Sequence, residues 1–207
     1  RSSAASDVYK RQLGNREITP DALGPRVADN MMITRHVIRE FGKYALGAEH
    51  SNLISSIVPG VMAQTGMESL EIIRGVIRET EPDCIVAVDA LAARSVKRLN
   101  RTIQITNTGI NPGSGVGNHR HGLNRESVGI PVIAIGVPTV VDAATIVNDA
   151  ISGYYEEVDC TLNSFFVTPK DIDESIKRLS FTISEGLNLA FEKTALSLIH
   201  ISEPTRP

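Results

Sequence analysis

Two acidic residues, Asp21 and Asp89, stand where alternating strands and helices would bring them together. Asp89 directly follows the apolar run CIVAV (84–88), and Asp21 follows Gly14-Asn15, where an earlier strand would end. In an open parallel sheet, ligands bind outside the carboxyl ends of the strands, so we expect both carboxylates at one rim. The pattern leaves an alternative open, in which each acid caps the helix that follows it.

Two neighbouring carboxylates favour hydrolytic chemistry. Repulsion between like charges raises the pKa of one member of such a pair, so that an acid and a base coexist at the same pH. The base would activate a water molecule for attack on a peptide carbonyl, and the acid would protonate the departing amine. We therefore predict Asp21 and Asp89 as catalytic residues that need no cofactor and no metal.

A glycine-rich segment, GINPGSGVGN (109–118), is the second candidate site. Without Cβ atoms, backbone N–H groups can approach a ligand closely and could bind an oxyanion or the substrate backbone. A dinucleotide fingerprint would need glycine at Asn118, and a phosphate loop would need Gly-Lys-Ser/Thr, so neither motif fits. A purely structural loop remains the alternative. The residues predicted for substrate or oxyanion binding are Gly113, Ser114, Gly115, Gly117 and Asn118.

The other potentially reactive residues do not form a recognisable catalytic or metal-binding motif. His119 and His121 lie in a polar stretch without a nearby cysteine or cluster of acids, which favours a solvated loop over a metal site. Ser114 stands in GSGVG and not in the G-x-S-x-G elbow of serine hydrolases. We expect Asp142 to cap a helix.

The elements that would position these residues alternate between helix and strand. The runs 84–88 and 131–136 are apolar on both faces, as is typical of central parallel strands. We expect an α/β fold: a mainly parallel sheet flanked by helices on both faces. We also expect helices at 21–41, with Pro25 in the first turn, and at 90–99, and a strand at 103–106. Three further helices are expected from their capping residues: one that starts at Thr65–Glu68 and ends before Pro82, one that starts at Thr139–Asp142 and ends near 151, and one that starts at Thr168–Asp171 and ends near 191.

Size and composition bound the function. The 207 residues suit a single domain, which we place at 13–195. The net charge of −3 argues against a nucleic-acid surface, and no long uncharged apolar run predicts a membrane span. Only two cysteines are present, with Cys84 expected in a buried strand, so we expect no disulfide framework and a reducing cytoplasm.

Both ends of the chain read as foreign to this domain. Residues 1–12 and 196–207 resemble the translated adapter sequence found fused to genes assembled from environmental DNA. We expect them to be non-native tails, and we expect the first native strand, before Gly14, to be lost or replaced.

Six segments in order resemble the germination protease family of spore-forming bacteria. They are TPDALGP (19–25), PGVMAQTGMESLEII (59–73), IVAVDALAARS (85–95), TGINPGSGVGN (108–118), GIPVIAIGVPTVVDA (129–143) and VTPKDID (167–173). The resemblance implies an atypical aspartic-type endopeptidase with a fold similar to that of hydrogenase maturation proteases. It also implies small acid-soluble spore proteins as substrates, a propeptide removed on activation, a homo-oligomer and a place in the spore interior.

The resemblance aligns Asp21 and Asp89 with two acids that bind a metal in the maturation proteases. Two departures stand out: Asn107 replaces an expected aspartate, and the stretch 151–167 is shorter than the family pattern. Two other functions remain open. One is a metal-binding maturation protease, and the other is a non-enzymatic module that binds a ligand through its glycine-rich loop.

Overall fold

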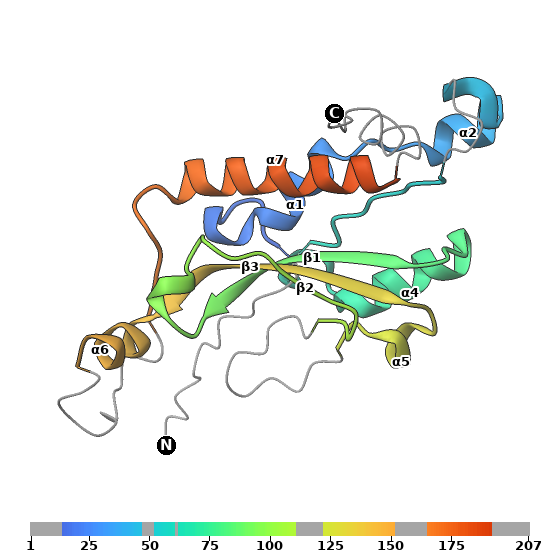
Figure 1. Cartoon of the computed structure of the whole chain (residues 1–207). Helices are drawn as coiled ribbons and strands as arrows, with labels where there is room; N and C mark the ends of the chain where they lie inside the picture. Colours follow the sequence, from blue (N-terminus) through green and yellow to red (C-terminus); the bar gives the residue numbers. More distant parts are fainter. Residues whose placement is uncertain (1–13, 47–51, 61, 111–121, 152–164, 192–207) are drawn as a thin grey trace, which may run out of the picture.

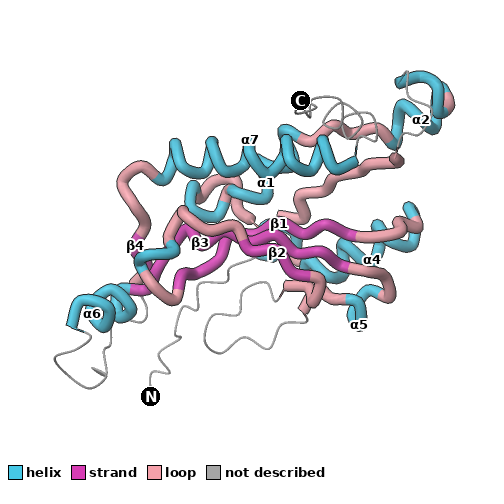
Figure 2. Tube along the Cα trace, viewed as in Figure 1, coloured by secondary structure: helices cyan, strands magenta, loops and turns pink. Residues whose placement is uncertain are grey.

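A mixed sheet of parallel and antiparallel strands lies at the centre of the protein (Figures 1 and 2). The computed structural model describes residues 14–46, 52–60, 62–110, 122–151 and 165–191, so both predicted tails lie outside the described residues. The strands β1 (Ile85–Ala93), β3 (Val132–Asp142) and β2 (Gln104–Thr106) lie side by side in that order, and β4 (Phe166–Val167) pairs with the end of β3. β1 and β3 pair in parallel over nine positions, whereas β2 and β4 pair antiparallel with β3 over three and two positions.

Helices cover both faces of this sheet, as predicted. Helices α1 (Leu23–Asn30) and α7 (Ile172–Phe191) lie on one face, and α4 (Ser69–Thr80) lies on the other (Figure 1). Two apolar clusters fill the two interfaces. The first joins Leu23, Val27, Ile135, Val137, Ile176 and Ile183, with Val86 and Val88 packed against it, and the second joins Leu70, Ile73, Ala87, Leu123 and Val132.

The remaining elements are short. They are the 3-10 helices η1 (Thr19–Asp21), η2 (Lys43–Leu46) and η3 (Val96–Arg98), and the α-helices α2 (Arg35–Phe41), α3 (Met62–Thr65), α5 (Arg125–Val128) and α6 (Ala143–Ile151). Among the helices described, none is both long and apolar enough to cross a membrane.

Both central strands are longer than predicted. β1 continues to Ala93, so the helix expected at 90–99 is wrong and only η3 lies within that range. β3 likewise continues to Asp142, with Thr139 buried inside it. The stretch after Asp89 is rich in alanine and leucine, which favour helix, but pairing with β3 in the core overrides that preference.

The helix predicted at 21–41 is two helices. α1 ends at Asn30, Met31 is extended, and α2 begins at Arg35, although Pro25 does lie in the first turn as expected. Asn188 of α7 stabilises the break, because its side chain accepts a hydrogen bond from the Met32 N–H at 2.9 Å and donates one to the Asn30 carbonyl at 3.1 Å.

Helix starts were predicted with mixed success. Asp142 does cap α6, since its Oδ1 accepts a hydrogen bond from the Thr145 N–H at 2.7 Å, whereas Thr139 belongs to the strand. α4 is capped by Glu68 and not by Thr65, and it ends before Pro82 as expected. Thr168 donates to the Thr139 carbonyl and does not cap α7. Cys84 is exposed, contrary to prediction, because β1 begins only at Ile85.

α1 packs directly on β1 through Gly24. A Cβ atom at this position would lie 2.7 Å from the carbonyl oxygen of Val88. The Ile85 N–H bonds to the Pro131 carbonyl, so alternate residues of β1 (85, 87, 89) direct their backbone groups toward β3, and Val88 directs its carbonyl to the outer edge. The start of α1 therefore lies against the outer edge of β1.

We predict that Gly24→Ala lowers the free energy of unfolding by about 1–3 kcal/mol, because the added methyl group overlaps a backbone atom that cannot move alone. Gly75→Ala is the matched control: it lies in the middle of α4 with open space around its Cα, and should stabilise by about 0.5–1 kcal/mol through helix propensity. Urea denaturation of the two variants measures both changes. Equal stability of the two variants would contradict the close packing of α1 on β1.

Candidate functional site

Asp89 is buried inside the sheet. Its residue is 4% exposed, and its Oδ1 accepts a hydrogen bond from the backbone N–H of Ala90 at 2.9 Å. The prediction that Asp89 follows the end of its strand is therefore wrong, because β1 extends four residues beyond it. The capping alternative is excluded for the same reason, since no helix begins there. A carboxylate held in a buried strand is fixed in position by the backbone on both sides.

The register of the sheet shows what lies beside Asp89. Its partner on β3 is Gly136, and the partner of Gly136 on β2 is Gln104, so the three residues form one row across the sheet. Side chains alternate along a strand, and Ala87 packs toward α4, so Asp89 lies on the α4 face. The side chain of Leu91 lies over Gly136, in the space a Cβ would fill. Sequence reasoning missed this row, because no local pattern reveals which residues pair.

Asp21 lies in the short loop that leads into α1. It is half-buried at the end of η1, and the loop closes through hydrogen bonds from the Asn15 N–H to the Asp21 carbonyl at 3.0 Å and from the Asp21 N–H to the Ile18 carbonyl at 2.8 Å. The residue that caps α1 is Ala22, so the alternative role of Asp21 as the cap is excluded.

The structure brings the segment of Asp21 to the strand of Asp89. η1 contacts β1, β3 and α7. Asp21 precedes Gly24 by three residues, and Gly24 lies against Val88, the residue before Asp89. A chain of three residues spans at most about 11 Å, so the Asp21 backbone lies within that distance of the contact between Gly24 and β1.

The glycine-rich residues predicted to bind substrate, 113–118, lie outside the described residues, as do His119 and His121. The two ends of this segment are described. Ile110 and Leu123 form an isolated antiparallel bridge with N–H···O distances of 2.9 and 2.8 Å, and both pack in the cluster that contains Ala87. The segment therefore starts and ends on the same face of the sheet as Asp89.

An ion pair holds the Asp21 loop on α1. The Arg16 guanidinium donates two hydrogen bonds to Asp29, at 2.6 and 2.8 Å. The hydrogen bond from Arg16, with the attraction of its charge, lowers the pKa of the Asp29 carboxyl below its ordinary value of 3.8. Both side chains are about half exposed, so solvent screens the pair.

Within the described ranges, no three or more His, Cys, Asp and Glu residues gather as they would around a metal ion. Asn107, which stands where the family pattern suggested an aspartate, is exposed after β2.

We predict that Asp29→Asn causes a small loss of stability at neutral pH, and that this loss shrinks as the pH falls below 3.8. Because the pKa of Asp29 is lowered by folding, the pair contributes stability above 3.8 and loses it as the pH falls through the lowered value. Melting temperatures of the original chain and the variant across this range test the idea. A difference that does not shrink in acid would show that Asp29 acts through packing.

The sequence also matches those of known proteins. The sequence model described as germination protease matches residues 5–158. A germination protease from Caldanaerobacter subterraneus subsp. tengcongensis is 43% identical over 230 aligned residues, which cover 94% of this chain and 70% of the relative. One from Bacillus velezensis is 56% identical over 139 residues, covering 67% of this chain and 37% of the relative.

Among solved structures, the [NiFe] hydrogenase maturation protease HycI from Thermococcus kodakarensis KOD1 aligns with a TM-score of 0.43 and 19% identity, over 84% of this chain and 87% of that one. The chain spans less than two thirds of the length of several relatives, such as 64% of a Clostridium perfringens germination protease. The family assignment rests on the match over residues 5–158 and on the sequence identity along most of the chain. The chain belongs to the germination protease family, a family of peptidases.

Proposed function

We propose that this chain is an endopeptidase that cuts small acid-soluble spore proteins, with Asp21 and Asp89 as a catalytic carboxylate pair. The observation that supports this most directly is the burial of Asp89 in β1, next to the point where Gly24 brings the Asp21 loop against the strand. The names of the relatives support the peptidase activity.

In this mechanism, one carboxylate takes a proton from a water molecule as the water attacks the scissile carbonyl. The other member of the pair is protonated, and this carboxylic acid donates its proton to the amine that leaves when the C–N bond breaks. No metal or cofactor takes part. Backbone N–H groups of 113–118 would stabilise the oxyanion, which fits a segment whose ends, Ile110 and Leu123, lie on the Asp89 face.

The substrate enters as an extended segment, in which the peptide bond to be cut is free of secondary structure. Proteins that are disordered when released from DNA meet that requirement. We also propose that residues 13–195 form one protease domain, and that the enzyme works as a homo-oligomer in the spore interior.

We predict that Asp21→Asn and Asp89→Asn each reduce cleavage of a small acid-soluble spore protein by at least about 100-fold, because an amide can neither accept nor donate the required proton. The assay follows intact substrate by mass spectrometry, with circular dichroism to confirm folding. Asp173→Asn, an exposed acid at the start of α7, is the matched control and should leave the rate unchanged.

A chelator separates the carboxylate mechanism from that of a metal-dependent maturation protease. Full activity after chelation supports the carboxylate pair, whereas loss of activity that zinc or nickel restores supports the metal enzyme. Retained cleavage by the folded Asp89→Asn variant would refute the role of Asp89. Absence of cleavage by the original chain, together with ligand binding that survives both substitutions, would favour a ligand-binding module.

A further inference from the structure

The side chain of Asn100 is a buried amide that the mechanism above does not use. Its Nδ2 and Oδ1 atoms are both buried, and neither makes a hydrogen bond within the part of the chain that the structure describes. Its backbone is held firmly, since the Asn100 N–H donates to the Pro138 carbonyl at 2.8 Å. Leaving both ends of a buried amide unpaired is costly, so such a group calls for a binding partner.

Pro138 explains how Asn100 comes to this position. β2 and β3 pair from Gly136 to Ala134, and the next backbone group of β3 facing β2 belongs to Pro138, which has no N–H to donate. The ladder therefore stops. The Asn100 N–H donates to the Pro138 carbonyl instead, and Asn100 lies in a tight turn. In this turn the Arg101 N–H and the Thr102 hydroxyl both donate to the Arg98 carbonyl.

The turn needs a left-handed residue at Asn100, where φ is +54°. Asparagine tolerates this conformation better than most residues, but glycine tolerates it best. The backbone alone therefore does not require an amide side chain at this position.

The register places Asn100 near Asp89. Pro138 lies two residues beyond Gly136, the partner of Asp89, and Asn100 lies beside Pro138 on the β2 side. Two strand spacings of about 4.8 Å and two residues of about 3.3 Å along the strand place the two Cα atoms roughly 12 Å apart. This displacement is toward the carboxyl ends of β1 and β3, the end where parallel sheets usually bind ligands.

We propose that the Asn100 amide binds the main chain of the peptide substrate, about three to four residues from the bond that is cut. An extended chain covers about 3.3 Å per residue, so the separation of roughly 12 Å corresponds to that number of residues. A carboxamide has both donors and an acceptor, which match the C=O and N–H groups of a peptide without regard to its side chains. The inference rests on the proposed endopeptidase function.

The first test is Asn100→Gly, which keeps the positive φ and removes the amide. We expect KM for a peptide substrate to rise about tenfold while kcat stays within about twofold, the result of losing binding far from the reacting bond. We expect the melting temperature to stay the same or rise, because an unpaired buried group is removed. Unchanged KM with a lower melting temperature would show a purely structural amide, such as one holding a buried water, and would overturn the proposal.

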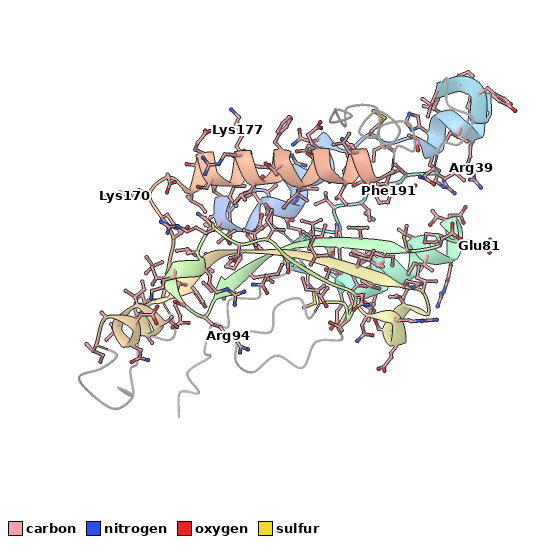
Figure 3. The ribbon with its side chains drawn as sticks, viewed as in Figure 1. Arg39, Glu81, Arg94, Lys170, Lys177 and Phe191 are labelled. Carbon is pink, nitrogen blue, oxygen red and sulfur yellow. The ribbon has the colours of Figure 1, made fainter. Side chains whose placement is uncertain are left out.

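Glu81→Gly is the matched control. Glu81 is the other described non-glycine residue with positive φ, at +46°, and it caps the end of α4. Glu81 precedes β1 and Arg94 follows it, and they lie toward opposite ends of the sheet in Figure 3, with Asn100 following Arg94 in the chain. The control repeats the backbone change far from Asn100 and should leave KM unaltered.

A second test separates this inference from the proposed function. Fluorescence anisotropy measures the binding of a labelled substrate peptide to two proteins: the Asp89→Asn variant, and the double variant that also carries Asn100→Gly. The measurement does not require either protein to cleave the peptide. The double variant should bind about tenfold more weakly, and peptides shortened to two residues on either side of the cut should bind both variants equally. Equal affinity of the long peptide for both variants, or binding to neither, overturns the role of Asn100. Loss of cleavage in Asp89→Asn alone bears only on the proposed function.

Discussion

The parallel pairing of β1 with β3 is the constraint on which the rest of the structure depends. Both strands are covered on both faces, so their side chains set the packing of α1, α7 and α4 at once. Two close approaches depend on glycine: Gly24 lets α1 reach the outer edge of β1, and Gly136 makes room for the side chain of Leu91. The two glycines lie on either side of Asp89, so the packing that stabilises the sheet also fixes the proposed catalytic residue.

A buried acid inside a strand is expensive unless its oxygens are hydrogen-bonded. The Ala90 N–H supplies one such bond to Asp89, and this donor belongs to backbone that the strand already orders. By contrast, the loop of Asp21 depends on the surface ion pair of Arg16 with Asp29, which solvent weakens. The two proposed catalytic acids are therefore held by different means: Asp89 by the sheet, and Asp21 by a loop with its own hydrogen bonds.

Sequence patterns predicted what local chemistry decides. The strands at 84–88 and 131–136 were recognisable because both faces are apolar, and Asp142 was recognisable as a cap from its position before α6. The continuation of β1 through Ala90 to Ala93 was not, because alanine favours helix until a partner strand overrides it. The row of Asp89 with Gly136 and Gln104 depends on register, which pairs residues far apart in sequence and leaves no local signal.

Pro138 shows how one residue that is unsuited to a central strand can shape a site. On the β1 side it pairs in register with Leu91, where the ladder then shifts by one residue before Ala92. On the β2 side it offers a carbonyl but no N–H, so the antiparallel ladder ends and the chain turns. The turn places a left-handed residue, Asn100, on that carbonyl and leaves the Asn100 amide without a strand partner. Pro138 thus ends the ladder with β2 and leaves the Asn100 side-chain amide without a strand partner, where the proposed peptide substrate could use it.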